Sequence, residues 1–186
     1  MVLEKGLRVY HGSYTIVEKP QLEICKPGKD FGVGFYVTTD IEQARRFVKL
    51  SVGKARKNGV VGNEIEKGYV SVYEIAGLGK ASCFEFLGAD KEWLHCVAAH
   101  RKEPLLPQEL AKWKSYEIIG GKIANDNTNR VITGYINGIY GEVGSDSADR
   151  IAISLLEPEN LTDQICFRTA NALKALKYAG FEEVLL

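Results

Sequence analysis

Residues 29–39 read KDFGVGFYVTT, and they indicate how the surrounding chain is built. Two glycines interrupt the first part, and the aromatic and β-branched run that follows, residues 34–38, is typical of a short strand. Thr39 and Glu42 have the spacing of a capping box, with Thr39 as the cap. Apolar residues then recur at the helical period until Gly59. The stretch therefore predicts a loop, a strand and a helix in direct succession.

Short strands and helices mix irregularly along the rest of the chain. We expect strands at residues 7–12, 69–75, 116–119, 164–167 and 181–186. We expect helices from Asp90, over 107–113, over 131–140, and from a Thr169 cap through Leu173 and Leu176, with 141–150 as polar loop, with or without helical turns. Because the order is not a regular βαβ alternation, the predicted fold class is α+β. No boundary or repeat divides the chain, so one domain over residues 1–186 is expected.

Composition narrows the class of protein. The 186 residues contain 24 Lys plus Arg and 24 Asp plus Glu, and this zero net charge argues against a strongly electrostatic nucleic-acid binder. No apolar run reaches the roughly 18 residues of a membrane span, and the first residues lack the apolar core of a signal peptide. The four cysteines show no CxxC spacing. Reduced thiols and a cytoplasmic location are therefore expected.

Several familiar motifs fail on inspection. Gly32 and Gly34 begin a dinucleotide fingerprint, but Val37 stands where the third glycine belongs. Residues 77–80, GLGK, mimic a phosphate-binding loop without the Ser or Thr that would hold magnesium. The histidines do not have the spacing of a zinc helix, so no metal site is expected.

Two short segments carry candidate ligand-binding residues. Tyr10-His11-Gly12-Ser13 ends the first strand and sets an imidazole beside bare backbone groups, which can hold a flat amide and a ribose hydroxyl together. In residues 30–39 the glycines let the backbone pass close to a ligand, and Tyr36 would present a ring on which a heterocycle can stack. Alternatively, His11 is a loop histidine with ordinary hydrogen bonds, and Tyr36 is a core residue.

Together these motifs resemble the ADP-ribosyltransferase superfamily. More narrowly, they are similar to its diphtheria-toxin and poly-ADP-ribose polymerase side, whose triad runs His, Tyr and then Glu or a substitute. The bacterial DUF3990 family is the most similar: its YHGS start, KDFGxGFY-x-T segment and late D-Q-I-x-F-x-T segment match residues 10–13, 29–38 and 163–169. The resemblance covers nearly the whole chain. It implies two small packed β-sheets split by an NAD cleft, with helices outside.

The resemblance also implies roles for individual residues. His11 would bond the ribose hydroxyls of NAD, and the backbone of Gly12 would pair with the nicotinamide carboxamide. Tyr36 would stack on the nicotinamide ring, and Gln164 best matches the third triad position. The implied NAD contacts are His11, Gly12, Ser13, Tyr36, Thr38 and Arg168, the last because an arginine can fork onto a phosphate. Alternatively, Arg168 is a solvated charge at a strand end.

Gln164 departs from the glutamate of the best-known transferases. An amide still forms hydrogen bonds but contributes no charge, and electrostatic stabilisation is often the largest catalytic effect. Either the glutamine suffices, or another carboxylate such as Asp126 or Asp163 is recruited, or NAD binds with little catalysis. Asp126 also fits an N-cap cluster ahead of the helix over 131–140.

The expected function is therefore that of an NAD-dependent ADP-ribosyltransferase or NAD glycohydrolase. NAD would be the substrate, and ADP-ribose would pass to an unidentified macromolecular acceptor, protein rather than nucleic acid, or to water. The resemblance further suggests a bacterial toxin or effector with a neutralising partner protein and no membrane attachment. The alternative is a non-catalytic NAD-binding or protein-interaction module that retains the fold.

Overall fold

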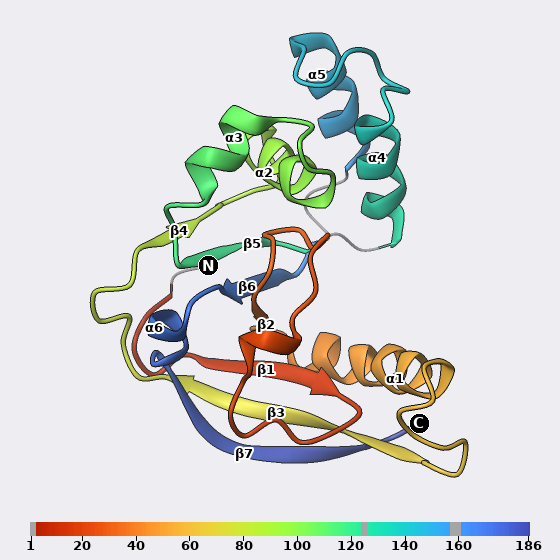
Figure 1. The fold of residues 1–186 in the computed structure, drawn as a ribbon, viewed down its shortest axis with the longest axis vertical. Coiled ribbons are helices and arrows are strands. Elements are labelled where there is room, and N and C mark those ends of the chain that lie inside the picture. The colour runs from red at the N-terminus through yellow and green to blue at the C-terminus, as the bar shows by residue number, and fades with distance from the viewer. Residues whose placement is uncertain (1–2, 124–125, 157–160) are drawn as a thin grey trace.

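A computed structural model describes residues 3–123, 126–156 and 161–186, without the side chain of Asp126 (Figure 1). The strands are β1 (Arg8–Ser13), β2 (Phe35–Thr38), β3 (Lys67–Ile75), β4 (Cys83–Glu85), β5 (Ile118–Lys122), β6 (Asp163–Phe167) and β7 (Leu176–Leu185). The helices are η1 (Leu22–Ile24), α1 (Ile41–Lys57), α2 (Lys91–Arg101), α3 (Pro107–Trp113), α4 (Asp126–Ile136), α5 (Asp146–Leu155) and α6 (Ala170–Leu173). This mixture confirms the α+β class.

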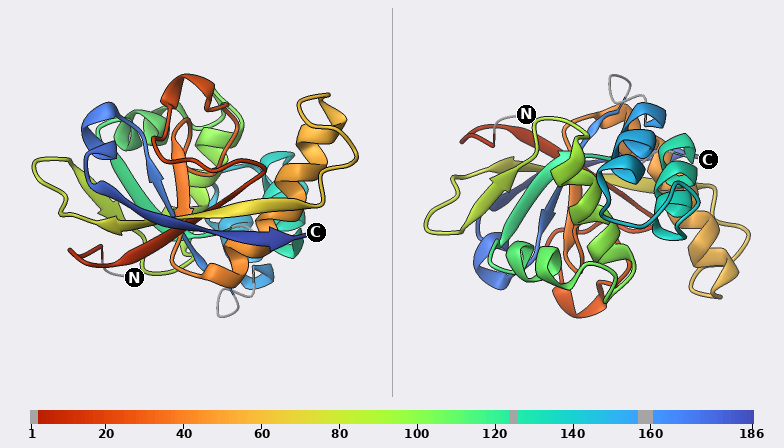
Figure 2. Two further views of the ribbon diagram at one scale, coloured as in Figure 1. Left: turned by 90° about the horizontal axis from the view of Figure 1, so that it is seen from below. Right: turned by 90° about the horizontal axis from the view of Figure 1, so that it is seen from above.

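The strands form a seven-stranded sheet in the order β4-β5-β6-β2-β1-β3-β7. The pair β4–β5 is parallel, and the other pairs are antiparallel. β1 and β2 share a single register pair, Tyr10 with Thr38. This narrow link separates an upper half (β4, β5, β6 and β2) from a lower half (β1, β3 and β7), whose strands run across those of the upper half when seen from below (Figures 1 and 2).

One hydrophobic cluster, which we call the shared core, takes residues from both halves. The lower half contributes Val9 and Tyr73, and the upper half contributes Phe35, Ile118 and Ile165, all almost fully buried. The rings of Phe35 and Tyr73 meet edge to face with centroids 5.7 Å apart. Burial of this apolar surface is what holds two halves that share so little backbone pairing.

Helices α1 to α5 pack against the opposite face of the sheet from the shared core. α2, α3, α4 and α5 cover the upper half, and their buried residues form an outer core around Trp93, Trp113 and Ile132. α1 covers β1 and β3 through Val48 and Val52. Figure 1 shows the two helical groups well apart, with α2–α5 above and α1 below.

Helix α5, with 10 residues, is longer than the helical turns that were the alternative to a polar loop over residues 141–150. Ser145 caps it, and Asp149 on its buried side accepts a hydrogen bond from His95 Nε2 at 2.9 Å and from the hydroxyl of Tyr135. That hydroxyl in turn accepts from the amide of Gly144 at 2.9 Å. A polar network thus fastens α5 to α2 and α4, which an apolar periodicity cannot reveal.

Element boundaries differ from expectation at two further places. Asp40, not Thr39, caps α1, because its Oδ1 accepts the amides of Glu42 and Gln43 at 2.9 and 3.2 Å. Thr169 does cap a helix, but α6 ends at Leu173. Leu176, expected on that helix, instead begins β7 and packs on the shared core from there.

The side-chain-free face of Gly12 is what lets α1 lie directly on β1. A Cβ at Gly12 would sit 2.1 Å from the carbonyl oxygen of Ala44, which is backbone and cannot move aside without shifting the helix.

In the described part of the chain, no helix combines the length and apolarity needed to cross a membrane.

We predict opposite effects for two glycine-to-alanine changes. Gly12→Ala should lower the free energy of unfolding by about 1–3 kcal/mol, because it overpacks the α1–β1 contact. Gly53→Ala, on α1 with no atom near its missing side chain, should raise it by about 0.5–1 kcal/mol. Chemical denaturation of both variants measures the two changes, and equal effects would contradict the packing role of Gly12.

Candidate functional site

Strands β2 and β6 place three of the predicted residues side by side. Their antiparallel register sets Thr38 opposite Gln164 and Tyr36 opposite Cys166. Because side chains alternate along a strand, Tyr36, Thr38 and Gln164 share one face, while Phe35 and Ile165 point into the shared core. Residues 128 positions apart in sequence, Tyr36 and Gln164, are thereby neighbours on paired strands.

His11 reaches the same strand from the lower half. Its Nδ1 lies 2.7 Å from the carbonyl oxygen of Tyr36, and its ring lies 4.5 Å from that of Phe35, centroid to centroid. A carbonyl can only accept, so Nδ1 carries the proton and the neutral ring keeps a lone pair on Nε2. Burial lowers the pKa of His11, although the bond to Tyr36 opposes this. The ring lies on the Phe35 side of β2, not on the side of the Tyr36 hydroxyl.

Beyond Tyr10, β1 pairs with β3 alone. His11, Gly12 and Ser13 are in register with Ser71, Val70 and Tyr69, but none of them pairs with β2. The edge of β1 that faces β2 is thus free of a strand at these three residues. An amide group could bond to such a backbone edge in place of a strand.

Gly12 and Gly34 have a packing role within the protein, and the expected approach of a ligand to the glycines of residues 30–39 stays a prediction. The missing side chain of Gly12 makes room for α1, as described above. A Cβ at Gly34 would lie 2.4 Å from Sγ of Cys166 and 2.7 Å from the carbonyl oxygen of Phe167. Close approach of the protein's own elements explains both residues.

The hydroxyl of Tyr36 is held by the loop that precedes its strand. It donates to the carbonyl of Gly32 at 2.7 Å and accepts from the amide of Phe31 at 3.0 Å. Burial raises the pKa of Tyr36 far above its usual range, and the nearby Cys166 adds to this, so the phenol stays neutral. These bonds fix the ring of Tyr36, which is half-buried beside the outer core.

The amide of Gln164 has one fixed orientation. Its Nε2 donates to Oδ2 of Asp30 at 2.7 Å and to the carbonyl of Lys122 at 3.2 Å. Both partners can only accept, so the NH₂ must face them and the amide oxygen must face away. Asp30 is itself paired through Oδ1 with Nε of Arg101 at 2.7 Å. Neither Asp30 nor Arg101 was among the predicted site residues, although Asp30 belongs to the stretch that predicts the fold.

Thr38 and Arg168, predicted as NAD contacts, form hydrogen bonds within the protein. The side chain of Asp126, a candidate carboxylate, is not described. Thr38 donates its hydroxyl to the carbonyl of Asp163 at 2.8 Å and accepts the amide of Asp40. Arg168 Nη1 donates to the carbonyls of Trp113 and Tyr116 at 2.6 and 3.3 Å, which fastens the end of α3 to β6. Asp126 begins α4, and its side chain lies outside the described residues. Cofactor contacts by these residues stay predictions.

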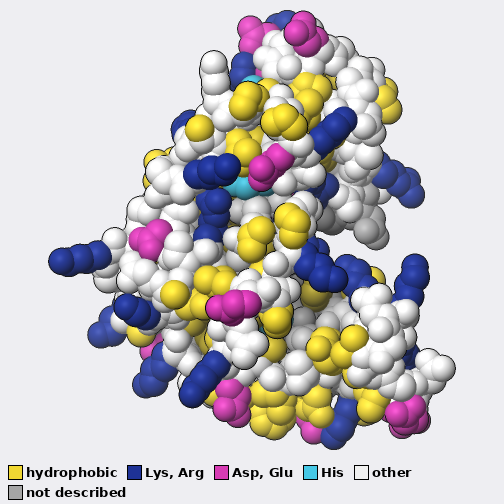
Figure 3. Space-filling view, in the orientation of Figure 1, with side chains coloured by type: hydrophobic (Ala, Val, Ile, Leu, Met, Phe, Trp, Pro, Cys, Tyr) yellow, Lys and Arg dark blue, Asp and Glu magenta, His cyan; other side chains and the backbone are white. Residues whose placement is uncertain are grey.

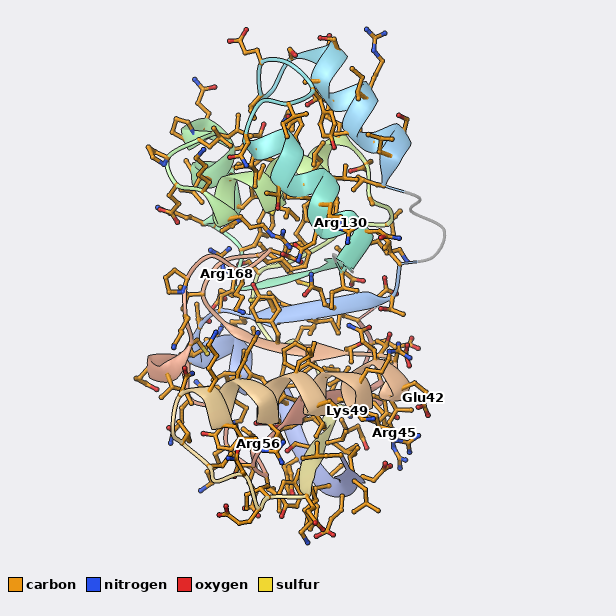
Figure 4. The ribbon with its side chains drawn as sticks, turned by 90° about the vertical axis from the view of Figure 1, so that its right-hand side faces the viewer. Glu42, Arg45, Lys49, Arg56, Arg130 and Arg168 are labelled. Carbon is orange, nitrogen blue, oxygen red and sulfur yellow. The ribbon has the colours of Figure 1, made fainter. Side chains whose placement is uncertain are left out.

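The molecule is hollowed on the side where α4 and α1 face each other, and Lys and Arg side chains stand on both banks (Figure 3). Figure 4 looks at this side: Arg130 lies on α4 and Lys49 on α1, with strands of the upper half between the two helices. Burial and the positive charge of Lys54 lower the pKa of Lys29, against the opposing effect of Asp30. Within the described ranges, His, Cys, Asp and Glu form no group of three that could hold a metal ion.

We predict that His11 makes stability fall in mild acid. Its folded-state pKa lies below the ordinary 6.5, so under that pH the unfolded chain takes up a proton that the folded protein refuses. Each pH unit then costs up to about 1.4 kcal/mol. His11→Asn keeps an N–H donor for Tyr36 but does not titrate. Between pH 7.5 and 5.5, wild type should lose about 1 kcal/mol more unfolding free energy than the variant in urea titrations; parallel losses would contradict this.

Comparison with known proteins bears on the family alone. No curated protein matches the chain. Residues 7–178 match a family described as "Protein of unknown function (DUF3990)", and the match contains the His11 strand, the KDFGVGFYVTT stretch and β6. A match of this extent, which spans every candidate residue discussed above, shows that the chain belongs to the DUF3990 family.

Proposed function

We propose that the protein is an NAD-dependent ADP-ribosyltransferase or NAD glycohydrolase. The observation that carries this proposal is the parting of β1 from β2 after the pair Tyr10–Thr38. The His11 ring lies at this parting on the Phe35 side of β2, and Tyr36 and Gln164 lie on the opposite face of the paired strands. Two half-sheets that share a core while separating at one edge are what a split-sheet NAD cleft requires. The resemblance described above gives the same three residues as a His-Tyr-Gln triad.

Each residue has a feature suited to this substrate. The unpaired edge of β1 at Gly12 offers backbone groups to the nicotinamide carboxamide. The neutral His11 keeps a lone pair on Nε2, which can accept a ribose hydroxyl. The amide oxygen of Gln164, turned away from Asp30, can accept another. The ring of Tyr36, held at its hydroxyl, would stack on nicotinamide.

The chemistry needs positioning more than acid or base. The bond between ribose C1 and the nicotinamide nitrogen breaks with both electrons leaving on nicotinamide, which departs neutral. The ribose becomes an oxocarbenium-like cation, and an acceptor nucleophile or water then captures it and loses a proton. Oriented hydrogen-bond acceptors near that cation stabilise it in a partly dry site.

The hollow between α4 and α1 suits the diphosphate of a dinucleotide. Arg130 and Lys49 stand on its two banks, and the described residues provide neither with an ion pair. Exposed cations that are not already paired are available to phosphate oxygens. A macromolecular acceptor would approach from the same open side, and the zero net charge favours a protein over a nucleic acid.

A second function is favoured by one observation, the neutral amide at position 164. Without a carboxylate in contact with the ribose, the protein could hold NAD and cleave it slowly or not at all. It would then serve as an NAD-binding or protein-interaction module. Binding without turnover distinguishes this function from the first.

We predict that purified protein releases nicotinamide from NAD and that His11→Ala and Tyr36→Ala reduce the rate by about 10²-fold or more, since each removes a group from the reacting centre. Chromatography of free nicotinamide measures the rate, and melting temperature with and without NAD measures binding. Asp146→Asn, an exposed change on α5, is the control and should behave as wild type. A melting shift without release would support the binding module, whereas neither signal would refute the NAD proposal.

A further inference from the structure

We propose that Asp30 is a positioning residue that acts through Gln164 and supplies the negative charge that a glutamine triad lacks. This inference rests on the proposed function, because it assigns the charge to a step of that reaction. In this proposal no carboxylate touches the ribose. Instead, the buried carboxylate of Asp30 bonds to the amide of Gln164, and that amide contacts the ribose.

The contact is buried and short. Asp30 and Gln164 are 8% and 6% exposed, and their Oδ2 and Nε2 atoms are 2.7 Å apart. The carbonyl of Lys122 takes the second amide proton at 3.2 Å. With both N–H groups directed inward, the amide oxygen of Gln164 is presented on the other side. Loss of either acceptor would allow the amide to turn over.

Arg101 keeps the carboxyl group of Asp30 in place. Its guanidinium contacts Oδ1 through Nε at 2.7 Å and through Nη2 at 2.5 Å, which leaves Oδ2 for Gln164. The Arg101 side chain is 18% exposed, so the pair is largely shielded from water.

The order of the three side chains determines which charge acts on the amide of Gln164. The negative end of the Asp30–Arg101 pair is the end that touches Gln164, and the positive end lies farther away. A hydrogen bond to an ionised acceptor polarises the amide and draws electron density toward its oxygen. An amide oxygen polarised in this way stabilises a cation on the ribose better than an isolated glutamine does.

Two single variants separate orientation from charge. Asp30→Asn removes the charge and leaves one carbonyl oxygen, which can accept from Gln164 only if the new NH₂ group faces Arg101. We expect kcat for nicotinamide release to fall at least tenfold, with less than threefold change in KM for NAD. Gln164→Glu sets a second carboxylate against Asp30. The two must share a proton near neutral pH, so its activity should rise toward alkaline pH. Asp146→Asn again serves as the matched control.

The double variant Asp30→Asn with Gln164→Glu reverses the polarity of the pair, since the asparagine amide can donate to the glutamate. We expect kcat to return to within threefold of wild type and the alkaline shift of the pH profile to disappear. A role confined to stability would restore neither. The proposal is overturned if Asp30→Asn keeps wild-type kcat, or if the double variant is no faster than both singles.

Two further measurements test the proposal if Asp30→Asn is unstable or if the wild type is inactive. Should Asp30→Asn melt below the assay temperature, the pH profile of Gln164→Glu decides alone, and a profile like that of wild type overturns the proposal. Should wild type release no nicotinamide, the proposed function fails first. Carbon NMR of the carboxyl group introduced by Gln164→Glu then tests the coupling itself. A pKa that is raised in the single variant and ordinary in the double variant supports the pairing, and equal values overturn it.

Discussion

The structure depends on one backbone pair, Tyr10 with Thr38, at which β1 and β2 meet and then separate. Had the two strands continued together, the sheet would have closed over the carbonyl of Tyr36. Instead, the side chain of His11 bonds to that carbonyl, and the two halves are held by the apolar side chains of the shared core. Burial of apolar surface is non-directional, so it can join the halves without further backbone pairing between β1 and β2.

A second constraint, the set of hydrogen bonds made by Asp30, fixes the orientation of Gln164 on the upper half. Asp30, in the loop before β2, joins the end of α2 through Arg101 and the start of β6 through Gln164. A buried carboxylate is tolerated only with such partners, because an unpaired charge would cost far more than the contact returns. The same bonds that satisfy Asp30 therefore determine which atom of Gln164 is presented. The same hydrogen bonds thus contribute to stability and set the geometry of the candidate site.

Several features could be predicted from the sequence because each leaves a local period or a cap. They are the α+β class, the amphipathic α1, and the strands around residues 8–12, 35–38 and 164–167. Helix α5 could not be predicted in the same way, since its buried face consists of the small or charged residues Ala148, Asp149 and Ala152, whereas its larger apolar residues Ile151 and Leu155 are exposed. The triad candidates came from motifs, which mark positions but not partners. The Asp30–Gln164 bond spans 134 residues, and no local pattern encodes such a contact.

The place of β6 in the sheet has a consequence for how the protein is made. β6 lies between β5 and β2, yet Thr38 and its bonded neighbour Asp163 are 125 residues apart. At ribosomal speed, on the order of ten seconds pass between the emergence of the two. During that interval β2 and β5 expose edges that nothing in the chain has yet covered, a state prone to aggregation. Under the proposed function, a nascent polypeptide that has not yet reached Gln164 would also lack one residue of the triad.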